Sequence, residues 1–370
     1  MIKLEGKRNT AIVFADKLDK PTKTQISSLL REEAYSDSKI RIMPDTHSGK
    51  HVAVGTTMTV SKRVAPALVG VDIGCGMEVV FLAEQELDLE RLDSVIHSHV
   101  PAGAKVHNVP PVSFDLDHLL CNANINRERA LCSLGTLGGG NHFIEVDRTE
   151  NGNLALVIHS GSRQLGSDVA SYYQDQAYRY QCKKQRKRTR QSYYDAKDAD
   201  AYCFSKTEKG VVKVKREEAI LEGPLFNSYL HDLTVVTDFA DLNRRTIAEL
   251  ICKHMGLTVR DRFSCVHNYI DTEHMILRKG AISARLGERV IIPLNMRDGA
   301  VLGVGKGNPE WIFPLLTVQA AHAAEQKRSM LLLSRIINAK WKEYSRQRRT
   351  RAPSTNALWR TNHPSGYLIL

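Results

Sequence analysis

The sequence predicts an α+β fold in which mixed or antiparallel sheets are surrounded by helices. Short apolar runs typical of strands follow one another through residues 56–83, 142–160 and 275–296, and helical patterns interrupt them irregularly. Because strands and helices do not alternate regularly, a doubly wound sheet or a barrel is disfavoured. The chain contains no internal repeat and no long linker, which indicates one main domain.

The elements follow in chain order. Near the N-terminus we expect a strand at residues 11–15, a helix around residues 24–34 and a strand at residues 39–45. The remaining predicted strands are short and largely apolar, and they cover residues 56–60, 66–73, 77–83, 142–146, 154–160, 275–281 and 289–296. Helices are predicted near residues 87–99, from Gly166 into a basic run, and over the apolar-periodic segment 238–255.

Length and charge restrict the class of protein. The 370 residues are 42% hydrophobic and 25% charged, as in a globular chain. The formal net charge is +11, but residues 312–370 hold ten Lys or Arg and two Glu, so residues 1–311 carry only +3. The basic run KKQRKRTR at residues 183–190 follows an aromatic stretch, and it fits contact with RNA phosphates or a solvated helix face equally well.

Cysteine usage and hydropathy bear on the compartment. The seven cysteines include no CxxC pair, which argues against a disulfide framework and a zinc ribbon and indicates reduced thiols. The sequence shows no pattern of a secretion signal and no run of about 18 apolar residues that could cross a bilayer. We therefore expect a cytoplasmic protein with no membrane partner.

The stretch VGVDIGCGMEVV at residues 69–80 places Asp72 and Cys75 three residues apart between glycines. One interpretation is a tight turn, in which glycines supply positive φ angles and Cys75 packs as a small apolar side chain. The other is a metal site, because thiolate and carboxylate are both ligands and glycines let them converge on one ion.

Histidines near the ends of predicted strands favour the metal site. His142 follows GTLGGG and Asn141, His159 ends LALVIHS, His267 lies in CVHNYID, and His47 lies in PDTHSG. A single histidine at a strand end is usually a hydrogen-bonded structural residue, but several beside glycines and polar turn residues suggest ligands. Neighbouring Asn, Ser and Asp side chains could orient the imidazole rings.

Seven motifs in order resemble those of the RtcB family of RNA-splicing ligases: PDTHSG, VGVDIGCGM, GTLGGGNHFIE, IHSGSRQLG, VHNY, RKGA and GKGNPEW. They cover about residues 40–311, so we expect residues 1–311 to form the ligase core. The resemblance implies the family's own α+β fold, with a metal site at strand ends. It also implies GTP- and Mn²⁺-dependent joining of an RNA end bearing a 2′,3′-cyclic phosphate or 3′-phosphate to a 5′-hydroxyl end.

The same resemblance implies ligands for two manganese ions. Asp72 and His142 would bind one ion, His159 and His267 the second, and Cys75 would bridge both. Cys75 and His142 are therefore also the catalytic candidates. These residue types suit the chemistry, because thiolate favours transition metals, carboxylate and imidazole suit Mn²⁺, and paired ions can hold a phosphate and activate water or a hydroxyl.

Guanylate-lining positions are implied in three segments. Asn141 and nearby backbone amides would lie near the phosphate, and Glu145 would be a further contact. The complete implied set is Asn141, His142, Phe143, Ile144, Glu145, His267, Asn268, Pro293, Leu294, Asn295 and Met296. The last loop departs from the family, which usually has PGSMG where this chain has PLNMR.

The implied reaction has three steps. A cyclic end is hydrolysed to a 3′-phosphate, a histidine takes GMP from GTP and passes it to that phosphate, and the 5′-hydroxyl displaces GMP. Two other functions stay open on the residues alone: a metal-dependent hydrolase of cyclic phosphate ends and a non-catalytic RNA-end-binding protein.

The resemblance stops at Trp311. Family members continue into a segment ending in HGAGR, whose histidine takes the guanylate, whereas this chain reads IFPLLTVQAAHAAEQKRSM. A diverged C-terminus with His322 as nucleophile is one interpretation, although AAHAAE has no glycines to approach a phosphate. A frameshift is the other, because permitted codons for residues 312–320 read F-S-A-P-H-G-A-G-R in the frame that begins at each codon's last base. We predict that residues 312–370 are a frameshifted, poorly ordered tail and that the chain binds metal without ligating.

Overall fold

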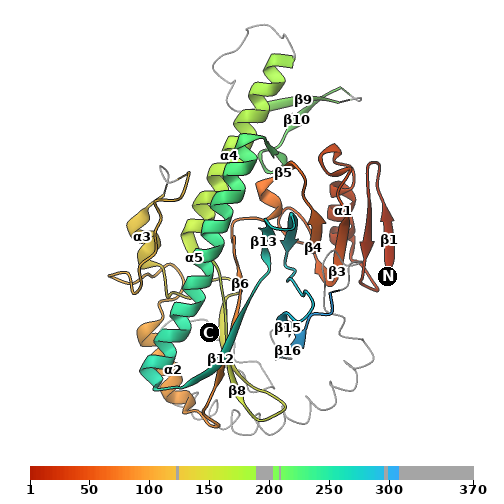
Figure 1. The fold of residues 1–370 in the computed structure, drawn as a ribbon. Coiled ribbons are helices and arrows are strands. Elements are labelled where there is room, and N and C mark those ends of the chain that lie inside the picture. The colour runs from red at the N-terminus through yellow and green to blue at the C-terminus, as the bar shows by residue number, and fades with distance from the viewer. Residues whose placement is uncertain (122–124, 189–202, 208–209, 296–298, 308–370) are drawn as a thin grey trace, which may run out of the picture.

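The computed structural model describes residues 1–121, 125–188, 203–207, 210–295 and 299–307 (Figure 1). The predicted tail at residues 312–370 therefore lies outside the described residues. So do residues 189–190 and the side chains of the basic run before them. Within the described ranges the chain has an α+β fold, as the sequence predicts.

Two main sheets organise the described strands. The larger has the order β1 (Ile2–Glu5), β2 (Thr10–Val13), β3 (Ile40–His47), β4 (Val54–Thr59), β14 (Ile276–Lys279) and β13 (Asn268–Asp271). The smaller has the order β12 (Val259–Val266), β6 (Gly76–Leu82), β8 (Leu154–Ser160) and β7 (Phe143–Arg148). All pairs in these sheets are antiparallel except β2–β3, which is parallel. This arrangement is neither a doubly wound sheet nor a barrel.

Three antiparallel strand pairs complete the described strands. They are β5 (Arg63–Val64) with β11 (Leu221–Glu222), β9 (Cys203–Thr207) with β10 (Gly210–Val214), and β15 (Arg289–Asn295) with β16 (Gly299–Val304). The helices are α1 (Lys20–Leu29), α2 (Leu89–His99), α3 (Arg127–Cys132), α4 (Arg163–Arg188) and α5 (Pro224–Met255), with 3₁₀ turns at Glu33–Tyr35, Pro66–Leu68 and Arg216–Glu218.

Local sequence signals fix where the helices begin. The side chains of Asp19, Asp88 and Asn126 accept hydrogen bonds from the third backbone N–H beyond them at the starts of α1, α2 and α3. Each such cap contributes about 1 kcal/mol. Helix α5 has Pro224 as its first residue, where the missing N–H costs nothing, and it ends before Gly256.

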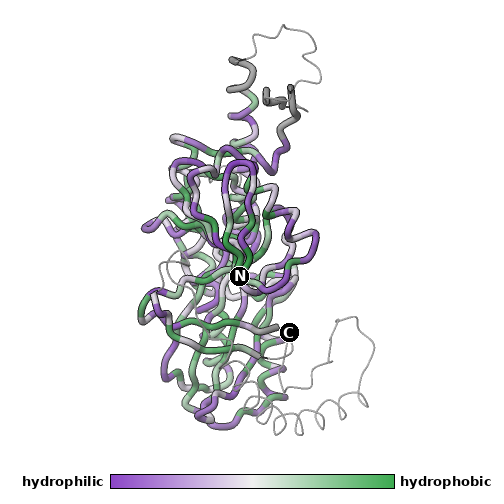
Figure 2. The backbone as a smooth tube through the Cα atoms, turned by 90° about the vertical axis from the view of Figure 1, so that its right-hand side faces the viewer, coloured by the Kyte–Doolittle hydropathy of each residue, from purple (hydrophilic) through white to green (hydrophobic). Residues whose placement is uncertain are grey.

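Helix α5 lies at the centre of the fold. It runs beside α4 through the length of the molecule (Figure 1). One side chain cluster joins the larger sheet to α1, α4 and α5, and a second joins one face of the smaller sheet to α2 and α5. The opposite face of the smaller sheet packs against β15. Figure 2 shows the matching hydropathy, with apolar segments in the interior and polar segments at the edges. The smaller sheet is therefore covered on both faces. Side chains can contact ligands at the edges that the ends of its strands form.

Several sequence-based elements need correction. Residues 66–73 do not form a strand: they begin with the 3₁₀ turn at Pro66 and continue as a loop in which Val69 and Ile73 are buried and Val71 is exposed. An apolar run reports burial, and burial alone does not distinguish a strand from a loop that crosses the core. Helix α5 begins at Pro224, well before the predicted residue 238, and α3, β1 and β12 were not predicted.

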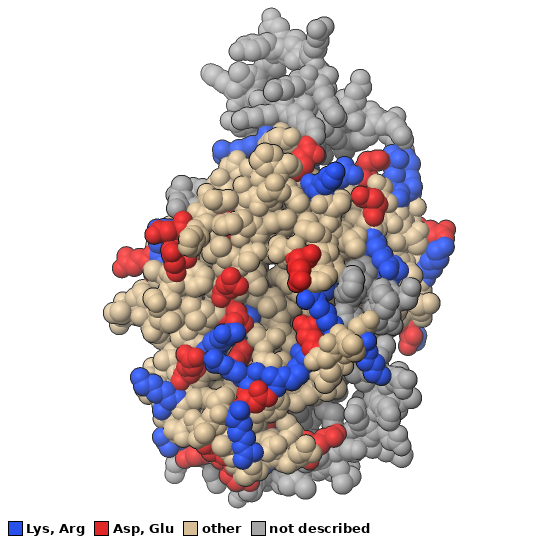
Figure 3. Space-filling view, in the orientation of Figure 1, with Lys and Arg blue, Asp and Glu red and all other residues tan. Residues whose placement is uncertain are grey.

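The surface charges, the cysteines and the helices can be compared with what the composition predicts. On the face shown in Figure 3, acidic and basic side chains of the described residues are interspersed. Six described cysteines are free thiols, five of them buried. Among the described residues, no helix is both long and apolar enough to cross a membrane.

Candidate metal centre

One edge of the smaller sheet collects four of the five predicted metal ligands. Cys75 immediately precedes β6 and His142 immediately precedes β7, while His159 lies at the end of β8 and His267 directly follows β12. Because these neighbouring strands are antiparallel, the starts of β6 and β7 lie beside the ends of β8 and β12. Adjacent strands are about 4.8 Å apart, so the side chains can reach a common centre.

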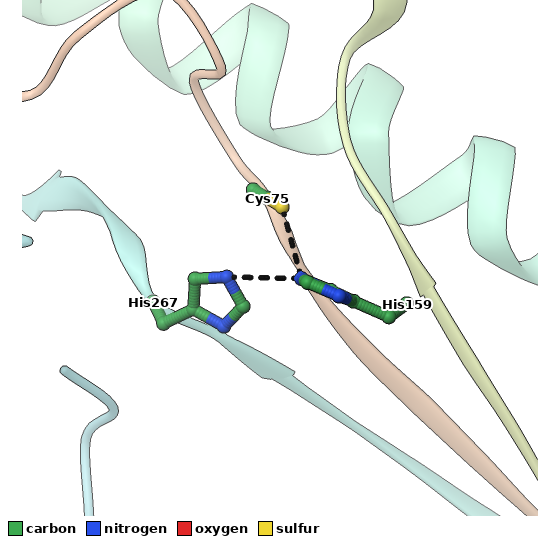
Figure 4. A group of neighbouring side chains, drawn as sticks. All are labelled: Cys75, His159 and His267. Carbon is green, nitrogen blue, oxygen red and sulfur yellow. Dashed lines mark hydrogen bonds between the residues drawn. The ribbon is translucent and has the colours of Figure 1, made fainter. Parts of the chain in front are cut away.

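The distances show that the side chains of the five predicted ligands converge. The Cys75 Sγ lies 3.3 Å from His159 Nε2 and 3.6 Å from His142 Nε2. The His159 Nε2 lies 3.3 Å from His267 Nε2 (Figure 4). Asp72 joins from the loop before β6, with Oδ2 3.0 Å from His142 Nε2. The structure thus forms two groups of donor atoms, Asp72–Cys75–His142 and Cys75–His159–His267, that share the thiol.

Backbone carbonyls orient two of the imidazoles. The His142 Nδ1 lies 3.0 Å from the carbonyl oxygen of Leu137, and the His159 Nδ1 lies 3.0 Å from that of Asn141. A carbonyl only accepts, so each Nδ1 carries its proton and donates it. The Nε2 atom of His159 then has a free lone pair that points into the cluster, which is the arrangement found around metal-bound histidines, whereas the Nε2 of His142 faces the Asp72 carboxylate.

The electrostatics of the cluster follow from burial. Burial would raise the pKa of Asp72, but the hydrogen bond and charge of His142 outweigh it and hold this pKa at about 2. Burial, reinforced by His142, lowers the pKa of His159 to about 4, and burial also lowers that of His267. Burial and the Asp72 carboxylate raise the pKa of Cys75. At neutral pH the cluster therefore offers the Asp72 carboxylate, the neutral imidazoles of His159 and His267, and the Cys75 thiol.

The donor set fits a pair of divalent transition metals. The facing Nε2 atoms of His159 and His267 lie 3.3 Å apart, so one can donate a hydrogen bond to the other, and with both atoms unprotonated the two lone pairs could share one cation. A thiol between two such groups can lose its proton and bridge two ions, because metal binding deprotonates a coordinating thiol. Asp72 adds an oxygen donor of the kind that suits manganese.

The Asp72 carboxylate reaches this cluster because it can pack closely against Gly161, which has no side chain. A Cβ atom at position 161 would lie 2.0 Å from Asp72 Oδ1 and 2.8 Å from its Cγ. Any larger residue would therefore displace the carboxylate. This explains why the glycine follows His159 and Ser160 in the motif IHSGSR.

A cavity of about 430 Å³ adjoins Asp72 and His142. Its polar lining includes Arg129 and Arg163, with Ser133, Gln164 and Ser167. Arg163 is fixed there because its Nε donates to Thr136 Oγ1 at 2.9 Å and its Nη2 to the Gly103 carbonyl at 2.7 Å. Two guanidinium groups beside a metal cluster form a setting suited to phosphate groups.

The predicted guanylate positions have different surroundings. Phe143 and Glu145 lie on the face of β7 opposite Ile144, whose side chain packs in the core against α2 and α5. Burial, with the neighbouring Asp147 carboxyl, raises the pKa of Glu145. The Asn268 Oδ1 accepts the Gly280 N–H at 3.0 Å, which ties this oxygen to the backbone just after the partner strand β14.

The remaining predicted positions are less informative. Asn141 is exposed and supplies the carbonyl that orients His159, and Pro293 is exposed on β15. Met296 and the side chains of Leu294 and Asn295 lie outside the described residues. The assignment of these positions to guanylate stays a prediction.

Sequence reasoning missed some of the site. Arg129, Ser133 and Ser167 line the cavity but lie outside the quoted motifs, and only their position in space brings them to the site; Gln164 lies in the motif IHSGSRQLG but was not singled out. His47, which the sequence singled out, is exposed, and its Nδ1 lies 3.0 Å from the Asp45 carbonyl oxygen. It is not in either ligand group.

Known proteins match most of this chain. The family model described as "tRNA-splicing ligase RtcB" matches residues 34–122 and 114–317. The RNA-splicing ligase RtcB of Escherichia coli strain K12 is 30% identical over 314 residues, which cover 73% of this chain and 71% of that protein. RNA-splicing ligase RtcB1 of Escherichia coli strain ATCC 25922 is 31% identical over 314 residues with the same coverage.

Proposed function

Because this chain belongs to the RtcB family of RNA-splicing ligases, we propose that its metal centre serves a GTP- and Mn²⁺-dependent reaction at RNA ends. The substrates would be one end with a 2′,3′-cyclic phosphate or 3′-phosphate and one with a 5′-hydroxyl. The observation that carries the proposal is the pair of donor groups that share Cys75 at one sheet edge. We place this activity in the cytoplasm.

The residues of the chain have distinct roles in this proposal. Asp72 and His142 would hold one ion, His159 and His267 would hold the other, and Cys75 would supply a donor to both. Bound metal would neutralise phosphate charge and favour deprotonation of an attacking water or hydroxyl. Arg129 and Arg163 in the adjoining cavity would hold RNA phosphates by charge-assisted hydrogen bonds. The fixed Arg163 would then orient the RNA end toward Asp72 and His142.

Guanylate would lie along the segments that the family resemblance indicates. Asn141, just before β7, and Glu145 on β7 would contact it, with His142 and Phe143 beside them and the segment around Pro293 on β15 as a further contact. Within the 370 residues, HGAGR, the motif of the guanylate-accepting histidine, does not occur. We therefore propose a core at residues 1–311 that binds metal, and a frameshifted segment at 312–370 that leaves it unable to ligate.

A metal-dependent cyclic-phosphate hydrolase is the second candidate function. The complete set of metal donors beside a cavity with two arginines favours it, since hydrolysis needs bound metal and water but no guanylate acceptor. A protein that has lost ligation could keep this step.

Guanylylation tests the proposal. We would incubate three proteins with labelled GTP and Mn²⁺ and look for a covalent adduct on a denaturing gel. The proteins are the chain as printed, its His322→Ala variant, and a chain in which the reading frame after Trp311 restores HGAGR. We expect an adduct only in the restored chain. An adduct in the printed chain that His322→Ala abolishes would show that its C-terminal segment is functional.

Two further results would decide between the candidates. A restored chain that binds metal but forms no adduct would refute the ligase, and release of 3′-phosphate from a cyclic end would then identify the hydrolase. The coding DNA tests the frameshift separately, because the shifted frame must contain CAC across the codons of Leu316 and Thr317.

A further inference from the structure

Helix α5 carries two adjacent polar residues that are completely buried beside the metal centre. Asn243 and Arg244 each have 0% of their surface exposed. A buried guanidinium is costly unless its donors find partners, so the partners indicate what the residue does.

Arg244 binds the backbone next to two metal ligands at once. Its Nη1 donates to the carbonyl of Gly74 at 2.8 Å and to that of Ser160 at 3.1 Å. Gly74 directly precedes Cys75, and Ser160 directly follows His159. One guanidinium therefore links the two strand ends whose side chains meet at 3.3 Å. Its Nη2 donates to Ser264 Oγ and to Asp241 Oδ1, each at 3.2 Å, and the carboxylate compensates the charge.

Asn243 holds the segments that carry the other ligand group. Its Oδ1 accepts the Thr136 N–H at 3.1 Å, and its Nδ2 lies 3.0 Å from Ser160 Oγ and 3.1 Å from the Gly161 carbonyl. Thr136 precedes Leu137, whose carbonyl orients His142, and Gly161 abuts Asp72. Ser160 Oγ also donates to the Leu137 carbonyl at 2.8 Å. The amide thus connects two backbone segments, at Thr136 and at Ser160 and Gly161, to one helix.

The loop that carries Cys75 also lies directly on this helix. Gly74 has a φ of +73°, and a Cβ atom there would lie 2.8 Å from Ala240 Cβ and 2.9 Å from Thr237 Cα. Close approach of the backbone brings the Gly74 carbonyl within reach of Arg244. Figure 4 shows the α5 ribbon, in its Figure 1 colour, passing behind Cys75.

We propose that Asn243 and Arg244 are positioning residues that set the distances between the metal ligands before metal binds. One rigid helix fixes the backbone beside Cys75, His159 and Asp72, and it also fixes the segment that orients His142. This inference rests on the proposed function only in that the cluster binds metal. Removal of such outer partners typically weakens metal binding 10–100-fold.

We call Asn243, Arg244 and their hydrogen bonds to the backbone the clamp. A matched pair of cysteines tests this clamp in metal-free protein. Cys75 and Cys121 are each 1% exposed. The backbone before Cys75 is held by Arg244, whereas the Cys121 N–H is held by Asp232 Oδ2 at 3.0 Å, and Asp232 is also fully buried on α5. We would measure alkylation of both thiols by peptide mass spectrometry in Arg244→Met, Arg244→Lys and Asp232→Asn variants.

The expected result is a crossover. Both Arg244 variants should increase the alkylation rate of Cys75 at least fivefold relative to Cys121, and Asp232→Asn should do the reverse. Lysine keeps the charge but cannot reproduce the planar fork, so it should restore only part of the protection and also serves if the methionine variant fails to fold. Equal increases at both cysteines, or no change at Cys75, would overturn the proposal.

Cobalt titration connects the clamp to the metal centre. Binding of Co²⁺, followed by the thiolate-to-metal absorption band, should weaken at least tenfold in the Arg244 variants. The control is Arg245→Lys, because the Arg245 Nε pairs with the same Asp241 at 2.8 Å but its side chain is 47% exposed. Unchanged Co²⁺ affinity in folded Arg244 variants would contradict the clamp. If the unmodified protein binds no Co²⁺, the proposed metal function fails, and the alkylation result still judges the clamp.

Discussion

Two clusters of donor side chains resemble each other in composition and differ in what balances their charge. At the edge of the smaller sheet, Asp72, Cys75 and three histidines form the two groups of the candidate metal centre. At the turn from β13 to β14, Asp271, Glu273 and His274 form another group whose donor atoms all lie within 4.8 Å. By proximity alone, each could hold a cation.

The second cluster already contains its cation. The Nη2 of Arg285 lies 2.6 Å from Asp271 Oδ2 and 2.7 Å from His274 Nδ1, and its Nη1 lies 3.5 Å from Glu273 Oε2. In the sheet-edge cluster, the described hydrogen bonds of the donors run to one another and to the carbonyls of Leu137 and Asn141. The difference teaches that converging ligands indicate a metal only where no side-chain cation fills the centre.

The largest expected effect is the loss of both ions from the first cluster. Cys75→Ala removes the shared donor, so elemental analysis should find the metal pair absent. Cys75→Ser should be nearly as damaging, because a neutral hydroxyl is a poor bridge. The matched control is His274→Ala in the second cluster, which should leave the metal content unchanged. The comparison fails if Cys75→Ala keeps two ions or if His274→Ala loses one.

A smaller effect should follow from Gly161→Ala, which affects one group only. The new methyl group would displace the Asp72 carboxylate, since a Cβ atom at position 161 would lie 2.0 Å from Asp72 Oδ1. We expect at least tenfold weaker binding of one Mn²⁺ ion, measured by calorimetric titration, while the ion at His159 and His267 is kept.

Gly152→Ala is the control for backbone strain. Gly152 has a φ of +80° with no other atoms near its Cβ position, so alanine there should lower stability without changing metal affinity. Equal metal affinities in Gly161→Ala and the unmodified protein would refute the proposed role of Asp72.

The smallest expected effect concerns a buried carboxyl group that is not one of the predicted metal ligands, and the quantity affected is the stability of the fold. Glu78 on β6 is buried, and neither carboxyl oxygen has a hydrogen-bond partner in the described structure, whereas Asp271 is paired with Arg285. Burial, with repulsion from Asp241, raises the pKa of Glu78 to about 7. Pairing has the opposite outcome at Asp271, whose pKa is lowered although burial alone would raise it.

The sign of the pH dependence follows from that shift. The unfolded Glu78 loses its proton near its ordinary pKa of about 4.5, so the folded state loses stability as the pH rises from there to about 7. Glu78→Gln should therefore stabilise the protein by about 2 kcal/mol at pH 8 and by almost nothing at pH 4. Urea denaturation at both pH values measures this, and a gain that is the same at both would contradict it.

The sequence by itself determined the fold class and brought forward the residues of the candidate metal centre. Irregular succession of strands and helices predicted an α+β fold, and five ligands were predicted because each lies in a short motif near a strand end. Such signals are local: a glycine-rich turn or a strand that ends in His159 can be recognised without its neighbours. The tail after Trp311 was judged from sequence alone, and it stays a prediction because it lies outside the described residues.

Only the tertiary structure decided which of these local features act together. The antiparallel order β12-β6-β8-β7 brings four ligands to one edge, and no local pattern specifies that order. The motif DLNRR appeared only as part of an apolar-periodic helix, yet its Asn243 and Arg244 contact residues 82 to 170 positions away. Likewise, only the packed fold places Arg285 in the cluster of Asp271, Glu273 and His274, where it occupies the position that a metal ion would take. Periodicity and motifs report what each segment requires locally, whereas hydrogen bonds and charge compensation between distant segments depend on the packed fold.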